Sequence, residues 1–210
     1  MIPAARYFTI DRLVPNLTDD QQWDLRKFSE VWQANRPKYD SVAQATNVPP
    51  QLIAAIHARE ADCDFNTYLL QGDPLGTRTW ADGDSNNGQS LPDSMEGTIL
   101  YQPGQWVEAA CFAIHAEEPN QTELGLTSTT TYLPALCAWA EMYNGAGYFN
   151  RNLPDPYVLS GTSGYKSGKF VSDHDFDPTF VDKELGVLPL LWKAFQLSDP
   201  VQLYKPPIAC

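Results

Sequence analysis

The sequence predicts a mainly α, α+β domain in which helices surround a small irregular β segment with long loops. Several segments repeat apolar residues at the three- and four-residue spacing of helices. Between them, residues 66–105 and 144–177 lose this periodicity, and the first stretch carries short runs of β-forming residues around Gly72-Asp73-Pro74. The sequence contains no internal repeat and no domain linker, so residues 1–210 are expected to form a single domain.

The N-terminal 49 residues contain two predicted helices. Thr18 and Gln21 form a capping box, in which a threonine caps the helix and a glutamine follows three residues later. This helix is expected to end before Pro37, because proline interrupts helical hydrogen bonding. A shorter helix is expected over Lys38–Thr46. No motif within residues 1–49 indicates a functional role for them.

A third helix is expected over Pro50–Ala61, since the ring torsion of proline suits the first helical position. The remaining expected elements are helices over Trp106–Glu117, Tyr132–Tyr143 and Thr179–Gln196, strands at Tyr68–Leu70 and Thr77–Trp80, turns over Ala81–Asp93 and a long loop over Asn144–Asp177.

The charge balance restricts the kinds of partner. The chain has 14 lysines and arginines against 26 aspartates and glutamates, which gives a formal net charge of −12. Such a surface repels phosphate backbones, so we do not expect nucleic-acid binding. It does not favour attraction to anionic cell-wall polymers either.

The spacing of the cysteines and the hydropathy of the chain indicate where the protein is made. The four cysteines form no C-x-x-C pair, and Cys111 and Cys137 lie in apolar helical patterns, so both are expected to be buried free thiols. No early segment has the charged start and apolar run of a signal peptide, and no stretch reaches the length of a membrane span. We therefore expect synthesis in the cytoplasm without a signal peptide and without membrane insertion.

Glu60, near the end of the third helix, is the main candidate for chemistry. Steps of three and four residues from Ile53 lead to Ile56 and Glu60, so the carboxylate shares the face that packs on the core. Desolvation and the negative end of the helix dipole both favour the neutral acid. A protonated glutamate can donate its proton to a glycosidic oxygen. Helix geometry leaves open the alternative that Glu60 pairs with Arg59 or another base at the helix end and only caps the helix.

The histidines and cysteines suggest weaker alternatives. His57, one turn before Glu60, is interpreted as a core histidine with satisfied hydrogen bonds rather than as a partner in catalysis. A cysteine peptidase would have to use Cys63 with His57, His115 or His174, and no recognisable motif surrounds this cysteine. A zinc hydrolase would need ligand spacing such as His-Glu-x-x-His, which the sequence lacks.

Several fragments occur in an order that is similar to a known family. They are Ile56–Glu60, Phe65–Leu69, Gly72–Leu75, Trp106–Ala110, Glu141–Tyr148, Pro156–Thr162 and Gly168–Asp173. Together they resemble phage and bacterial lysozyme-like peptidoglycan hydrolases, whose members commonly show a His-x-Arg-Glu-Ser helix end followed by a Gly-Asp-Pro-Leu turn. The likeness runs from about residue 50 to residue 190. More distantly, the glutamate helix and the Tyr-Asn-Gly motif resemble goose-type lysozymes and lytic transglycosylases.

The resemblance implies a lysozyme-like fold and cleavage of peptidoglycan glycan strands. By position, Glu60 becomes the catalytic acid, while Tyr143 and Asn144 become candidates for holding this acid or the N-acetyl group of the sugar. The serine that usually follows the glutamate is Ala61 here, so a hydroxyl role at that position is absent. The block Ala81–Asp93 also departs from the family pattern, which leaves one wall of the cleft unpredicted.

Three further residues are candidates for the same cleft. Tyr148 and Tyr157 lie in the long loop and are expected to bind sugars, with packing onto the helices as the alternative. Asp73 is the best second catalytic carboxylate, because the Gly-Asp-Pro turn would project it from the β segment, although aspartate before proline is also a common turn former. This chemistry requires no cofactor and no metal ion.

Three functions remain open at this stage. The first is a muramidase that acts as a phage lysin or as part of the virion, at the bacterial cell wall. The second is a lytic transglycosylase, which gives anhydro products. The third is a structural or wall-binding virion protein that keeps the fold without activity, with phage tail or baseplate proteins as partners. The presence of Glu60 argues against the third function, because a purely structural protein needs no acid on that helix face.

Overall fold

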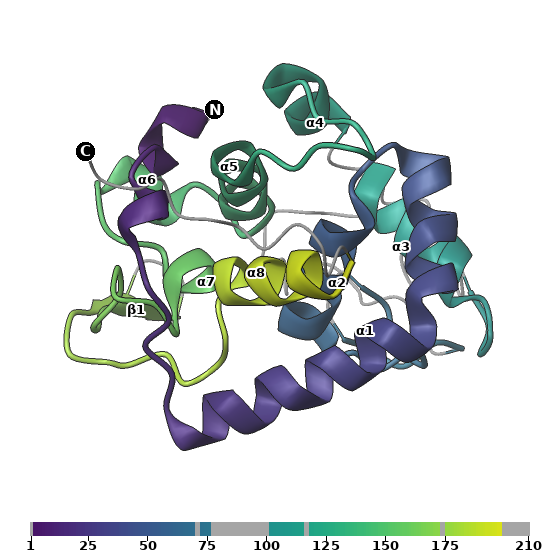
Figure 1. The fold of residues 1–210 in the computed structure, drawn as a ribbon, viewed down its shortest axis with the longest axis horizontal. Helices are drawn as coiled ribbons and strands as arrows, with labels where there is room; N and C mark the ends of the chain where they lie inside the picture. Colours follow the sequence, from purple (N-terminus) through teal and green to yellow (C-terminus); the bar gives the residue numbers. More distant parts are fainter. Residues whose placement is uncertain (1, 70–71, 77–100, 116–117, 173–174, 199–210) are drawn as a thin grey trace.

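The computed structural model describes residues 2–69, 72–76, 101–115, 118–172 and 175–198 (Figure 1). Within them the protein is mainly helical with one small sheet, as predicted. The elements are η1 (Ala4–Tyr7), η2 (Ile10–Arg12), α1 (Asp19–Thr46), α2 (Pro50–Ala61), α3 (Trp106–His115), α4 (Glu118–Leu124), α5 (Leu133–Tyr143), α6 (Gly147–Asn150), α7 (Pro156–Leu159), β1 (Lys169–Ser172), β2 (Asp175–Asp177) and α8 (Val187–Ser198).

Helix α1 begins with the predicted capping box. The backbone N–H of Gln21 donates to Thr18 Oγ1 at 3.2 Å, and Gln21 Oε1 accepts from the backbone N–H of Thr18 at 3.1 Å. The expected interruption before Pro37 is confirmed: the two predicted helical segments meet at a kink at Asn35, and α1 comprises both of them. Asn35 has a non-helical φ of −117°, so the helical hydrogen bonding is already disturbed where the proline follows.

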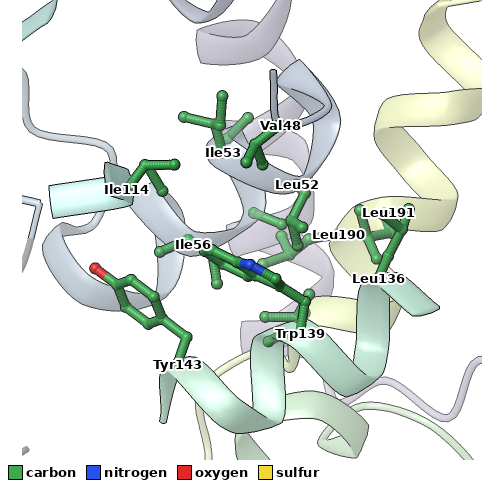
Figure 2. Packing of buried hydrophobic residues seen from close by; sticks show 14 of the residues in the cluster. Val48, Leu52, Ile53, Ile56, Ile114, Leu136, Trp139, Tyr143, Leu190 and Leu191 are labelled. Atoms are coloured by element: carbon green, nitrogen blue, oxygen red, sulfur yellow. The ribbon is translucent and has the colours of Figure 1, made fainter. Parts of the chain in front are cut away.

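Helix α2 has the predicted bounds and lies at the centre of the fold. It packs against α1, α5 and α8, and its residues 50–57 are all buried. Figure 2 shows Leu52 and Ile56 among Leu136 and Trp139 of α5 and Leu190 of α8. A helix surrounded on all sides must be apolar all round, which explains why α2 has no polar face until its last turn. The chain leaves the core only at residues 58–61, which are partly exposed.

The later helices agree in part with the predictions. Helix α5 begins one residue later than expected, while α3 is described to His115 and the last two residues of its predicted range lie outside the described residues. The final helix begins at Val187 instead of Thr179. At the predicted start, Asp177 Oδ1 accepts from the backbone N–H groups of Thr179 and Phe180 and holds a turn. Three short helices, α4, α6 and α7, occupy segments in which we predicted no helix.

The β structure differs from the prediction. Tyr68 and Leu69 do not form a strand; Thr67 makes only an isolated bridge with Pro74, and the backbone N–H of Tyr68 donates to Asp73 O at 2.7 Å. The predicted strand at residues 77–80 and the turns at 81–93 lie outside the described residues.

The two-stranded antiparallel sheet of the described chain lies instead within the segment predicted as a long loop, where β1 pairs with β2. Phe170 and Phe176 are partners in its register, and their rings meet edge to face at 5.3 Å. This aromatic cross-strand pair stabilises a hairpin too short to show a strand periodicity in the sequence.

Two further predictions concern thiols and membranes. Cys111 and Cys137 are free thiols, with Cys137 buried and Cys111 only partly buried, and Cys63 is also free. Cys210 lies outside the described residues. Among the helices described here, none combines the length and the apolar character needed to cross a bilayer.

Candidate functional site

A cleft of about 640 Å³ opens at the C-terminal end of α2, where this helix leaves the core. One wall belongs to α1, another to the last turn of α2 and the turn after it, and a third to the chain that leads into α8. The lining residues are Asp24, Lys27 and Phe28, residues 58–64, Thr67 and Gly72, and Glu184, Leu185 and Leu190. Glu60 is therefore part of the cleft surface.

Glu60 combines desolvation with access to this cleft. Its Oε1 accepts a hydrogen bond of 2.6 Å from Tyr157 Oη. Burial raises the pKa of Glu60 from its ordinary 4.5 to about 7, although the Tyr157 hydrogen bond and the Arg59 charge both act to lower it. Its side chain is nevertheless partly exposed. A carboxyl group that holds its proton near neutral pH and faces a cleft can act as a general acid.

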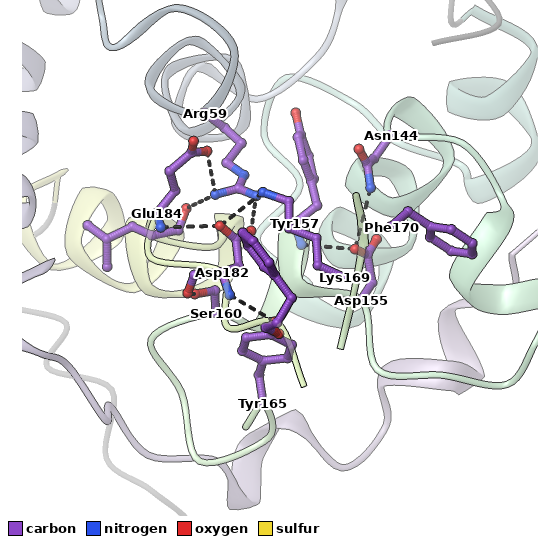
Figure 3. Close-up of polar contacts among 12 residues, drawn as sticks. Arg59, Asn144, Asp155, Tyr157, Ser160, Tyr165, Lys169, Phe170, Asp182 and Glu184 are labelled. Atoms are coloured by element: carbon purple, nitrogen blue, oxygen red, sulfur yellow. Dashed lines mark hydrogen bonds and ion pairs between the residues drawn. The ribbon is translucent and has the colours of Figure 1, made fainter. Parts of the chain in front are cut away.

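The alternative in which Glu60 pairs with Arg59 is wrong. Arg59 Nη2 pairs with Asp182, and its Nη1 lies 2.8 Å from Glu184 Oε2 (Figure 3). Lys169 Nζ also reaches Asp182, at 3.1 Å. Among the described residues, Glu60 makes no ion pair, so the neighbouring arginine leaves its proton available. Arg59 instead fixes the chain that forms the third wall of the cleft.

His57 is a core histidine, as interpreted from the sequence. Its Nδ1 lies 3.0 Å from Tyr39 Oη, and its Nε2 lies 3.1 Å from the carbonyl oxygen of Asp64. Because a carbonyl can only accept, Nε2 carries the proton and Nδ1 accepts from Tyr39. Burial lowers the pKa of His57 to about 4, which keeps the ring neutral. Its function is to anchor the turn that follows Glu60.

That turn has an unusual backbone. Asp62 and Cys63 both have positive φ values, of 53° and 62°. Two consecutive non-glycine residues in this region are strained, and such strain is typical of functional sites. Burial raises the pKa of the Cys63 thiol to about 12, so it is not a nucleophilic thiolate, and the cysteine-peptidase alternative loses support.

Tyr157 is held by a buried aspartate that our sequence analysis missed. Asp155 caps α7, and its Oδ1 accepts from the backbone N–H of Tyr157 at 2.9 Å and from Asn144 Nδ2 at 3.4 Å (Figure 3). Burial and the nearby Glu141 raise the pKa of Asp155 to about 8. The sequence did contain a local signal for this residue: an aspartate followed directly by a proline is a common helix start, with the aspartate as N-cap and the proline at the first helical position. Two predicted sugar-binding residues, Asn144 and Tyr157, are thus linked to Glu60.

All three tyrosines predicted to bind sugars pack into the interior, and Tyr157 itself is only 5% exposed. Tyr143 is only 5% exposed, and its ring stacks on Trp139 with centroids 5.3 Å apart. Tyr148 is 6% exposed, and its Oη accepts from the backbone N–H of Phe170 at 3.0 Å. These positions leave little ring surface for a sugar.

Asp73 lies next to Gly72 in the turn beside the cleft and is partly exposed. Gly72 lines the cleft, but Asp73 is not one of the lining residues. Within the described residues, the structure therefore gathers Glu60, Tyr157, Asp155 and Asn144 and leaves Asp73 at the margin.

A comparison with protein-family models, with curated proteins and with solved structures finds no match for this chain. Within the part of the chain that the structure describes, no group of three or more histidines, cysteines, aspartates or glutamates is arranged to hold a metal ion.

The Tyr157 hydrogen bond yields a test of how Glu60 is tuned. Tyr157→Phe removes a donor that favours the charged carboxylate, so we expect the pKa of Glu60 to rise further above its ordinary value. An NMR titration of the Glu60 carboxyl carbon in both proteins measures this change. An unchanged pKa would mean that this hydrogen bond does not tune Glu60.

Proposed function

We propose that this protein cleaves the glycan strands of peptidoglycan by general acid catalysis, with Glu60 as the acid. One observation carries the proposal: a carboxyl group in the wall of a cleft has a pKa of about 7 and no ion-pair partner among the described residues. The resemblance of residues 50–190 to lysozyme-like hydrolases supplies the substrate class and a lysozyme-like fold.

The hydrogen bond to Tyr157 determines which oxygen of Glu60 acts. Because Oε1 accepts from Tyr157 Oη, the proton of the neutral acid belongs on Oε2. In the proposed step this proton passes to the glycosidic oxygen, the bond from that oxygen to the anomeric carbon breaks, and a positively charged sugar remains. The new carboxylate is stabilised by the Tyr157 hydroxyl and by the nearby Arg59 charge.

The direct test is digestion of purified cell wall followed by mass spectrometry of the soluble fragments. We expect disaccharide-based muropeptides with the wild-type protein and almost none with Glu60→Gln. Binding of the wall without any release of fragments would favour the wall-binding virion protein. Release of peptides with intact glycan strands would contradict glycan cleavage.

Asp73 distinguishes between two fates of the positively charged sugar. In a lysozyme, water attacks, often assisted by a second carboxylate, whereas in a lytic transglycosylase the C6 hydroxyl of the sugar closes an anhydro ring. The family resemblance favours hydrolysis, which predicts reducing ends. Because Asp73 does not line the cleft, a large loss of rate in Asp73→Asn would mean that it acts from the margin. Anhydro products are lighter by one water, so the same mass spectra separate the two outcomes. Predominantly anhydro ends would make Asp73 a turn residue only.

The charges of the cleft predict a dependence on salt. Asp24, Asp62, Asp64 and Glu184 line it against the single ammonium of Lys27 and the paired Arg59. Burial and the charge of Asp62 raise the pKa of Asp24, so carboxylates on two walls affect each other. An anionic wall should therefore be cleaved faster as the Debye length falls from about 30 Å at 0.01 M salt to about 10 Å at 0.1 M. An oligomer of N-acetylglucosamine alone, which carries no carboxylate, serves as the uncharged control and should show little change.

A further inference from the structure

An exposed tryptophan of α1 lies beside residues of the cleft wall without lining the cleft itself. Trp23 is 57% exposed, whereas Trp32, Trp106 and Trp139 are all 2% exposed or less. The residue after Trp23 is Asp24, and one helical turn further is Lys27; both line the cleft that contains Glu60. The Lys27 ammonium lies 5.9 Å from the centroid of the Trp23 ring. The indole is therefore in contact with a residue of the cleft wall.

Folding does not explain this tryptophan. The core face of α1 is supplied by Phe28 and Trp32, which are 3% and 2% exposed and lie four residues apart on one side of the helix. Trp23 comes five residues before Phe28, which places it about 140° around the helix from that face. The indole thus gains little from the core and still presents a large apolar ring to solvent.

We propose that Trp23 is a sugar-stacking platform that extends the Glu60 cleft by one binding position along α1. The inference rests on the proposed function, since it assigns the same glycan strand to both places. A pyranose ring offers an apolar face of C–H groups to an indole, while its hydroxyl groups need acceptors at the edge. Asp24 provides a carboxylate in the neighbouring cleft wall, and Lys27 provides an ammonium next to the indole for an acidic substituent of the sugar.

The test measures binding of peptide-free glycan strands of graded length to the Glu60→Gln protein, which cannot cleave them. Adding Trp23→Ala should weaken binding of the longer strands by about tenfold or more, as truncation of a tryptophan anchor does. The fluorescence of Trp23 should shift on binding, and this shift should be missing after the substitution. Unchanged melting temperatures verify that both proteins are folded.

Tyr132→Ala is the matched control, because Tyr132 is 52% exposed and does not line the cleft. The Tyr132→Ala protein should bind the glycan strands with unchanged affinity. If glycan strands bind with equal affinity and give an equal fluorescence shift with and without Trp23, Trp23 is not a sugar-binding platform. In that case, cleavage of glycan by the wild-type protein would still support the proposed function. If the wild-type protein neither binds nor cleaves glycan, both proposals fall together.

Discussion

Glu60→Gln should abolish most glycan cleavage, by about 10²–10⁴-fold, because a general acid contributes a factor of this size. The amide has nearly the shape of the carboxylic acid, and its oxygen can still accept from Tyr157 Oη. The variant loses only the proton that the mechanism transfers. Release of soluble muropeptides, measured at equal protein concentration, checks the effect. Wild-type rates in a folded Gln variant would remove Glu60 from the mechanism.

The same substitution should increase stability at high pH, which separates loss of chemistry from loss of fold. The folded pKa of Glu60, about 7, lies above its ordinary 4.5, so this group favours folding below pH 4.5 and loses that contribution as pH rises to 7. At pH 8 the wild-type protein buries a charge that Gln does not carry. We expect Glu60→Gln to be more stable there by up to about 3 kcal/mol, with little difference at pH 4. Denaturant titrations at both values measure this, and a variant that is less stable at pH 8 would contradict it.

Asp182→Asn should cost up to about 3–5 kcal/mol of unfolding free energy, because it leaves the buried Arg59 with only the exposed Glu184 as its counter-charge. Arg59 is 5% exposed and Asp182 is 2% exposed, and Lys169 is the second cation on this carboxylate. Burial alone would raise the pKa of Asp182, but the charges of Arg59 and Lys169 outweigh it and lower this pKa. Its contribution is therefore present above the ordinary pKa of aspartate and is lost as the solution becomes more acidic.

Asp40→Asn is the control for this substitution. Asp40 also pairs with an arginine, Arg36, at 2.6 Å, but both side chains are at least 35% exposed. An exposed pair four residues apart on a helix contributes less than about 1 kcal/mol, so this variant should differ little from wild type. Denaturant midpoints at pH 7 compare the two variants. Equal losses would mean that the buried pair does not hold the chain around residues 182–185 in place.

Much of the fold could be predicted because the signals act over a few residues. The capping box at Thr18, the proline at the start of α2 and the apolar spacing of Leu52, Ile53 and Ile56 each depend on local geometry. The errors also have local causes. The last helix begins at Val187 instead of Thr179, and residues 177–180 form a turn on Asp177. The strands β1 and β2 were missed because three or four residues carry too little periodicity to be recognised.

The amino-acid sequence by itself determined that Glu60 lies at the end of a helix whose apolar residues face the core, and it thereby made Glu60 the candidate acid. Only the tertiary structure decided what surrounds this group. Tyr157 is 97 residues from Glu60 along the chain, and Asp182 is 123 residues from its partner Arg59. Capping and periodicity act within one or two helical turns. The pairing of distant side chains depends instead on how α2, α7 and the chain before α8 pack together, and that packing also produces the desolvation that raises the pKa of Glu60.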